Sequence, residues 1–107
     1  MAVALSRGEI RWYRFSHPDK RRPVLVLTRD SALEYLGEAT IFPITSTVRG
    51  IPSEVPWTAA DGMRGDCAVN LDHVQTVSRE KLGALITTRS AYRMRQVRQA
   101  LLFALGF

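Results

Sequence analysis

Apolar residues follow a strand-like pattern over most of this chain and a helical pattern only at its end. Short runs rich in β-branched and aromatic residues are bounded by polar residues, which is typical of strands. The run "DCAVNLDHVQTV" alternates well and is compatible with one bent strand or two. Strands are expected at residues 9–15, 23–29, 39–47 and 51–57, and over 66–77. Pro52 and Pro56 share one parity, so their missing N–H groups could point outward from an edge strand.

From Ser90 onward, apolar residues recur at helical spacing, and the arginines fall mostly elsewhere on the helical wheel. These apolar residues are Met94, Val97, Leu101 and Leu105. Ser90 is a suitable N-cap, and Gly106 is suited to end the helix. The sequence therefore predicts a mainly β fold in which about five to seven mostly antiparallel strands form a sheet or small barrel closed by a C-terminal helix.

The bulk properties of the chain limit its class. Its 107 residues suffice for one domain, residues 1–107, that buries a core without metals or disulfides. Cys67 is the single cysteine, which excludes an intrachain disulfide. The first residues do not resemble a signal peptide, and no apolar run approaches the roughly 20 residues that span a bilayer, so we expect a cytoplasmic protein. The formal charge of +5 permits a polyanionic partner without requiring one.

Familiar catalytic and metal-binding motifs do not occur in the sequence. The two histidines and one cysteine lack metal-ligand spacing, and there is no HExxH, Gly-rich phosphate loop or G-x-S-x-G. We therefore expect neither a metal nor a cofactor. His17 is interpreted as an exposed loop residue, His73 as a structural residue within a strand, and Cys67 as a buried, inert thiol.

Two segments bring cations and hydroxyls to the ends of expected strands. "KRRP" places Lys20, Arg21 and Arg22 directly before one strand, and "PITSTVRG" places hydroxyls and an arginine at the end of another. A guanidinium fork and a hydroxyl could together clamp a phosphate and stabilise charge during phosphoryl transfer. The alternative is solvated loop charge beside ordinary strand-forming threonines, and the spacing by itself favours that alternative.

Five motifs in order nevertheless resemble the MazF/PemK family, the toxin halves of bacterial toxin–antitoxin pairs. The motifs are R-G-E-I at residues 7–10, R-P-V-L-V-L at 22–27, P-I-T-S at 43–46, D-C-A at 66–68 and Q-T-V at 75–77. The resemblance covers residues 7 to about 82, followed by a compatible C-terminal helix. Each motif is modest alone, but the ordered set is specific.

The resemblance implies an SH3-like barrel with a C-terminal helix, assembled as a homodimer. It also implies metal-independent, sequence-specific endoribonuclease cleavage of single-stranded RNA, in which the 2′-hydroxyl attacks the adjacent phosphorus. The products would be a 2′,3′-cyclic phosphate and a 5′-hydroxyl. By the family motifs, Arg22 and Thr45 are the expected catalytic residues, while Arg21 and Lys20 supply supporting charge.

Further RNA contacts are expected from residues near these motifs. The expected RNA-binding set is Lys20, Arg21, Ser46, Thr47, Arg49, Gln75 and Thr76. Aromatic side chains could stack on unpaired bases, or they could belong to the core, which we expect for at least two of them. These aromatics are Trp12, Tyr13, Phe15 and Trp57.

The resemblance also predicts a partner, a MazE-like antitoxin whose acidic, partly disordered tail covers the RNA groove. The loop "SHPDKR" is shorter than in many family members, which leaves the cut-site preference open. His73 stands where glutamine is common and could add a pH-dependent RNA contact if it faces the groove. Two other functions remain as alternatives: a CcdB-like gyrase inhibitor, and a non-catalytic SH3-like module that binds nucleic acid.

Overall fold

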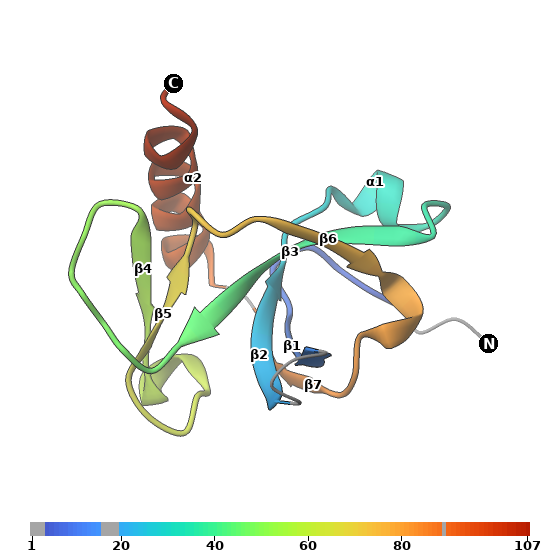
Figure 1. Ribbon diagram of the computed structural model, residues 1–107, viewed down its shortest axis with the longest axis horizontal. Helices are drawn as coiled ribbons and strands as arrows, with labels where there is room; N and C mark the ends of the chain where they lie inside the picture. Colours follow the sequence, from blue (N-terminus) through green and yellow to red (C-terminus); the bar gives the residue numbers. More distant parts are fainter. Residues whose placement is uncertain (1–3, 16–19, 89) are drawn as a thin grey trace.

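A computed structural model describes residues 4–15, 20–88 and 90–107 of the chain (Figure 1). Most of these residues belong to one curled antiparallel sheet, with a long helix packed beside it. The strands are β1 (Ile10–Phe15), β2 (Lys20–Val26), β3 (Glu38–Thr45), β4 (Glu54–Trp57), β5 (Cys67–Asn70), β6 (Gln75–Ser78) and β7 (Leu85–Thr87). The helices are α1 (Asp30–Leu33) and α2 (Ala91–Leu105), and two short 3-10 turns are η1 (Ala59–Asp61) and η2 (Arg79–Lys81).

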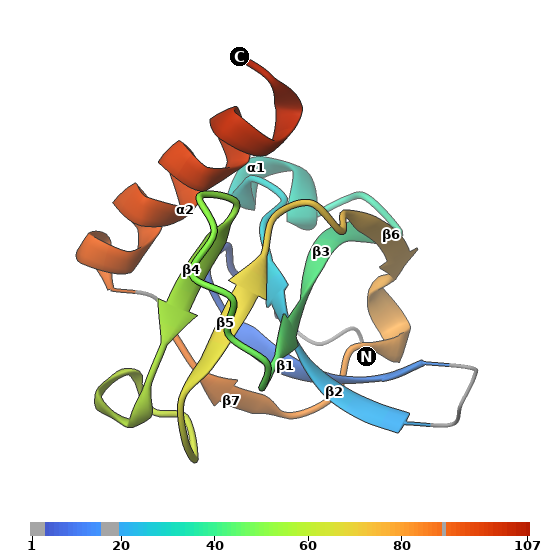
Figure 2. The same cartoon turned by 60° about the vertical axis from the view of Figure 1, so that its left-hand side comes forward.

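The curl of the sheet is centred on β3, its longest strand. Along one side, β3 pairs first with one strand and then with another. The strand order is β4-β5-β3-β2-β1-β7, and β6 also pairs with β3. The first half of β3 pairs with β6, and its end pairs with β5. The strand pairings of the described residues are antiparallel, and Figure 2 shows the two parts of the sheet folding toward each other as a half-barrel. The prediction of a mainly β, barrel-like fold with a C-terminal helix is confirmed.

Several expected strands have different limits. The run at residues 66–77 forms two strands, β5 and β6, with a turn that begins at Leu71 between them. The expected strand at 51–57 is shorter, because Pro52 lies in a turn and β4 begins at Glu54. β4 ends the strand order, and Pro56 is exposed there, as expected for a proline in an edge strand.

Both faces of β2 are covered, which explains its uninterrupted apolar run. Leu25 and Leu27 pack in a cluster with residues of α2, including Val97 and Ala100. Val24 and Val26 point into a second cluster, formed with α1, β3, β6 and the segment after η2. Because successive side chains of a strand alternate between its faces, a strand buried on both sides needs apolar residues at every position.

The C-terminal helix has the ends that the sequence predicts. The Ser90 hydroxyl accepts a hydrogen bond from the Arg93 backbone N–H at 3.1 Å, and Gly106 ends the helix with a φ of 81°. Val97 is buried, and Met94 and Leu101 pack against the core. The last position of the expected stripe, Leu105, is 58% exposed. Within the described part of the chain, no helix is long and apolar enough to cross a membrane.

Candidate active site

Arg22 and Thr45 come from two neighbouring antiparallel strands, β2 and β3. The register of these strands brings both residues toward the same end of the strand pair. The β2–β3 register pairs Val24 with Pro43. Arg22 lies two residues before Val24 and Thr45 two residues after Pro43, so in an antiparallel pair both are displaced in the same direction from this contact. Both residues line one cavity of about 580 Å³. Two motifs that are separated in sequence therefore meet because of strand pairing.

The segment that connects β4 to β5 also lines this cavity. Residues 62–67 all line the cavity, and we call this segment the cavity wall. Trp12 from β1 and two residues of β7 complete the lining. The cavity is thus lined both by residues of several strands and by an irregular loop. It combines apolar surface with exposed charges from Arg22, Arg64 and Asp66.

Arg22 is exposed and available to an anionic ligand. Among the described residues, no carboxylate lies within 4.0 Å of its guanidinium, and no hydrogen bond is recorded for it. The guanidinium has five N–H donors, and its planar fork fits two phosphate oxygens. Arg22 therefore retains its full donor capacity at the cavity.

The hydroxyl of Thr45 is already oriented by its own chain. The Thr47 backbone N–H donates to Thr45 Oγ1 at 3.1 Å. Since a hydroxyl can accept and donate at once, this contact leaves the Thr45 O–H group as a donor. Thr45 is partly buried, whereas Ser46 and Thr47 are exposed. Ser46 also lines the cavity, and Thr47 does not.

Arg21 stacks on Trp12 beside this cavity. The Arg21 guanidinium carbon lies 4.4 Å from the centre of the Trp12 ring. Stacking of this kind fixes the guanidinium without using its donors. Lys20 belongs to β2, but its side chain lies outside the described residues, as does all of His17.

The remaining expected RNA contacts lie away from the cavity. Arg49 is tied to Glu54, since its backbone N–H donates to Glu54 Oε1 at 2.9 Å and its guanidinium lies 3.9 Å from Oε2. Gln75 and Thr76 are exposed on β6, opposite Ile41 and Thr40. These positions are about four residues along β3 from Thr45, or about 13 Å.

The expected aromatic contacts divide into three kinds. Trp57 has no exposed surface and belongs to the core, so the suggestion that it could stack on bases is wrong. Tyr13 and Phe15 are half-buried, lie edge to face with ring centres 4.9 Å apart, and pack against the second core cluster. Trp12 is half-buried and lines the cavity, which leaves it able to meet a base.

Two expectations about single residues have opposite outcomes. His73 is exposed in the turn between β5 and β6, so the prediction of a structural histidine within a strand is wrong. Cys67 is buried, and its thiol donates to the Trp57 carbonyl oxygen at 3.0 Å. Burial, with smaller effects from Asp66 and Asp61, raises the pKa of the Cys67 thiol. A thiol with a raised pKa is a poor nucleophile, in agreement with the inert role predicted for it.

Sequence reasoning missed the charged residues of the cavity wall. Arg64 and Asp66 lie in "GMRGD", which has the appearance of an ordinary polar turn. This segment reaches the cavity that Arg22 and Thr45 line only when the sheet has folded, so the local sequence does not reveal its position. Among the described residues, no group of three or more His, Cys, Asp or Glu side chains could hold a metal ion.

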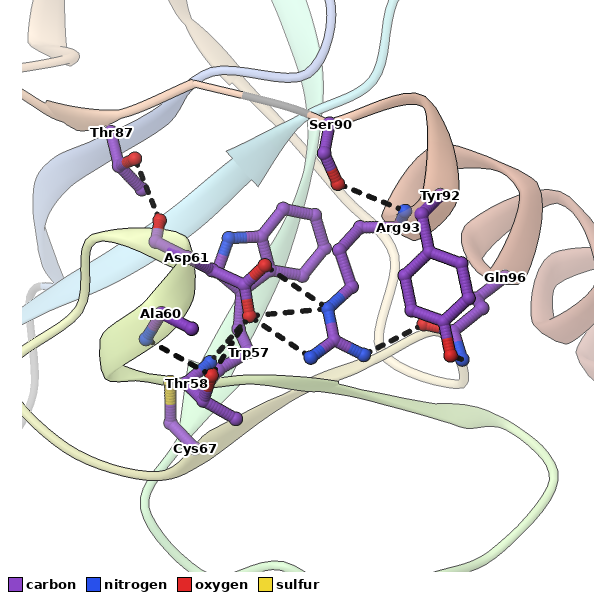
Figure 3. Close-up of polar contacts among 10 residues, drawn as sticks. All are labelled: Trp57, Thr58, Ala60, Asp61, Cys67, Thr87, Ser90, Tyr92, Arg93 and Gln96. Atoms are coloured by element: carbon purple, nitrogen blue, oxygen red, sulfur yellow. Dashed lines mark hydrogen bonds and ion pairs between the residues drawn. The ribbon is translucent and has the colours of Figure 1, made fainter.

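Asp61 anchors the start of the cavity wall (Figure 3). Its carboxylate accepts hydrogen bonds from the Thr58 backbone N–H at 2.8 Å and from Arg93 Nε at 3.1 Å. A second guanidinium nitrogen of Arg93 lies 3.0 Å away, and both side chains are 14% exposed. The backbone carbonyl oxygen of Asp61 accepts a hydrogen bond from the Thr87 hydroxyl at 2.8 Å.

Replacing Asp61 with asparagine is expected to destabilise the fold at neutral pH by about 1–2 kcal/mol, because a charge-assisted hydrogen bond is lost. The hydrogen bond from Arg93 lowers the pKa of Asp61 below its ordinary value of 3.8, although burial opposes this effect. A lowered carboxyl pKa stabilises the folded state above the unfolded-state value, and this stabilisation is lost as pH falls through the folded-state pKa.

Thermal denaturation between neutral and strongly acidic pH tests this expectation. The difference between wild type and Asp61→Asn should be largest at neutral pH and should shrink below about pH 4. Asp66→Asn, at an exposed position in the same segment, is the matched control and should change stability little. A difference that stays constant over the whole pH range would contradict the assignment.

Comparisons with known proteins agree with the half-barrel sheet and the C-terminal helix described above. The family described as "PemK-like, MazF-like toxin of type II toxin-antitoxin system" matches residues 6–105. "Probable endoribonuclease MazF2" of Mycobacterium tuberculosis is 36% identical over 103 residues, which are 95% of this chain and 99% of that protein. The solved structure of Mycobacterium tuberculosis toxin MazF-mt6 has a TM-score of 0.85 at 34% identity, covering 92% of this chain and 97% of that one.

A MazE–MazF complex from Deinococcus radiodurans is also similar, with a TM-score of 0.82 at 27% identity, covering 98% of this chain and 99% of that one. The family match extends over nearly the whole chain and includes the strands that carry Arg22 and Thr45. The chain therefore belongs to the PemK-like, MazF-like toxins of type II toxin–antitoxin systems.

Proposed function

We propose that this toxin is an endoribonuclease that cleaves single-stranded RNA at the cavity between β2, β3 and the cavity wall. Relatives with 36% and 44% identity are named as endoribonucleases. The observation that carries the proposal is the meeting of an exposed arginine and an oriented threonine hydroxyl at one cavity. Such a pair supplies donors where a scissile phosphate would lie.

The proposed reaction is an in-line displacement at phosphorus. The ribose 2′-oxygen forms a bond to the phosphorus and loses its proton, and the bond from phosphorus to the 5′-oxygen breaks. The leaving 5′-oxygen takes up a proton, so the products are a 2′,3′-cyclic phosphate and a 5′-hydroxyl. Negative charge accumulates on the non-bridging oxygens during this step, and Arg22 neutralises it. The Thr45 hydroxyl donates to the same phosphate and orients it for attack.

The residues around this pair extend the proposed RNA site. Arg21, held on Trp12, adds positive charge beside the scissile position, and Ser46 adds a hydroxyl donor. Lys20 is the first residue of β2, and we propose that it also binds RNA there. Thr47, Arg49, Gln75 and Thr76 are proposed to meet more distant nucleotides, since they do not line the cavity. Electrostatic attraction from these cations makes the binding of RNA dependent on salt.

We also propose that the toxin acts in the cytoplasm as a homodimer and is silenced by a MazE-like antitoxin with an acidic tail. The related toxin of Deinococcus radiodurans was solved as a MazE–MazF complex. The net charge of +5 suits an acidic partner as well as RNA. An acidic segment that folds on the same arginines would exclude the substrate.

The test is cleavage of a long unstructured RNA by the purified protein in excess EDTA. Cuts at a recurring short word, with cyclic phosphate ends, are the expected result. Intact RNA that is nevertheless bound would favour a non-catalytic binding module. Intact RNA together with loss of supercoiling by gyrase would favour a gyrase inhibitor. Cleavage that EDTA abolishes would contradict the metal-independent reaction.

Replacing Thr45 with valine is expected to lower the rate of cleavage by about 10²-fold, because the shape is kept and the donated hydrogen bond is lost. Thr45→Ser retains the hydroxyl and should keep most of the activity. Single-turnover rates on one RNA oligonucleotide make this comparison directly. Equal rates for the valine variant and the wild type would remove Thr45 from the proposed site.

A further inference from the structure

The cavity wall is an irregular segment held mainly at its two ends. Residues 62–66 belong to no strand or helix, and the wall joins the sheet only where β5 begins at Cys67. Its charged side chains, Arg64 and Asp66, are exposed at the cavity. A segment of this kind takes its position from its anchors, because it has no regular hydrogen-bond pattern of its own.

The anchor at the start of the wall is the pair formed by Asp61 and Arg93. The Arg93 guanidinium meets the carboxylate through Nε and one terminal nitrogen, and its other terminal nitrogen donates to Gln96 Oε1 at 2.9 Å. Figure 3 shows the guanidinium lying between the carboxylate and the amide. All three guanidinium nitrogens are therefore engaged, which fixes the orientation of the fork.

The same anchor joins three parts of the fold. Thr58 and Asp61 form a capping box around η1, and the Thr87 hydroxyl of β7 binds the Asp61 carbonyl oxygen. Arg93 adds the first turn of α2 to this contact set. A residue of the helix, 32 positions along the chain from Asp61, thereby contributes to where the wall begins.

Gly62 sets the direction in which the chain leaves Asp61, and this direction requires a glycine. Gly62 has a φ of 92°, a conformation that side-chain-bearing residues rarely adopt. A Cβ atom at this position would lie 2.5 Å from Thr87 Oγ1. The wall therefore starts from a point that the contacts of Asp61 hold, in a direction that a side-chain-bearing residue at position 62 would not readily allow.

We infer that the Asp61–Arg93 pair is a positioning device for sequence selection, which holds Arg64 and Asp66 where they meet a nucleobase next to the scissile phosphate. This inference rests on the proposed ribonuclease function. Base edges present both donors and acceptors, and a guanidinium and a carboxylate at fixed positions discriminate among them. Arg22 and Thr45 come from β2 and β3, so the reacting phosphate keeps its own donors when the wall moves.

The test is a cleavage profile on a random-sequence RNA pool, with the cut ends sequenced and the rate for each short word obtained. Each protein is assayed at a temperature at which circular dichroism shows it fully folded. For Arg93→Gln, we compare the cleavage rate at the preferred short RNA sequence with the rate at the second most preferred one. The ratio of these two rates is expected to fall by about tenfold relative to the wild type. Asp61→Asn should give the same relaxed profile, and Arg93→Lys, which keeps the charge but not the planar fork, should recover only part of the selectivity.

The control is Arg95→Gln, which removes the same charge from an exposed position of the same helix. Its cleavage profile should match that of the wild type. An unchanged ratio in Arg93→Gln, even with a lower melting temperature, would reduce the pair to a structural role and overturn the inference alone. If Arg93→Gln does not fold, Asp61→Asn and Arg93→Lys decide the question by the same ratio. RNA left intact by the wild type would overturn the proposed function and this inference together.

Discussion

Replacing Arg22 with alanine is expected to lower the rate of RNA cleavage by about 10²–10³-fold or more, the effect of removing one donor that stabilises transition-state charge. The stability of the fold should change little, because Arg22 is exposed and has no recorded partner among the described residues. Single-turnover cleavage and thermal denaturation of the same preparation separate these two effects.

Two further variants make the Arg22 experiment specific. Arg22→Lys keeps the charge but replaces the planar fork with a single ammonium, so it should recover only part of the lost rate. Arg95→Ala removes one positive charge from an exposed residue that does not line the cavity, and it should cleave at the wild-type rate. Cleavage by Arg22→Ala within a factor of a few of the wild type would disprove the catalytic assignment.

Replacing Trp57 with alanine is expected to destabilise the fold by about 3–5 kcal/mol, the usual effect of emptying a large core site. Trp57 is the largest fully buried side chain and packs among residues of β2, β3, β5 and α2. Its indole N–H is buried without a hydrogen-bond partner. Trp57→Phe therefore loses volume but no hydrogen bond, and it should be clearly milder than the alanine variant.

Urea denaturation at one fixed protein concentration measures this difference. Trp12→Ala is the matched control, because Trp12 is half-buried at the cavity, so its loss should lower the midpoint of denaturation much less. If Trp57→Ala and Trp12→Ala shift the midpoint equally, the burial that distinguishes the two tryptophans does not determine stability.

Much of the fold could be predicted because it is encoded locally. The caps of α2 depend on Ser90 and Gly106, whose preferences act within a few residues. The double burial of β2 is visible in its continuous apolar run. The spacing of Arg22 and Thr45 by itself favours solvated loop charge, and only the resemblance to the MazF/PemK family points to this pair; the antiparallel pairing of β2 and β3 brings both to one cavity.

The rest depends on contacts between distant segments, which local patterns do not encode. Nothing adjacent to Trp57 in the sequence distinguishes it from Trp12, and only the packing of α2 over β4 and β5 decides which indole is buried. The alternating run around His73 predicts a strand, yet the chain turns there. The pairing of Asp61 with Arg93 joins the loop after β4 to α2 and has no sequence signature.

The two sides of the cavity have different tolerances to sequence change, and this has an evolutionary consequence. Arg22 and Thr45 lie on strands whose neighbouring residues fill two cores, so substitutions around them alter packing on both faces. Met63 packs against the core, whereas positions 64–66 are exposed and follow a firmly anchored point, so many side chains fit at 64–66 without repacking. A toxin with the proposed ribonuclease site and base-selecting wall would acquire a new RNA target through a few loop substitutions while its reaction chemistry stays intact.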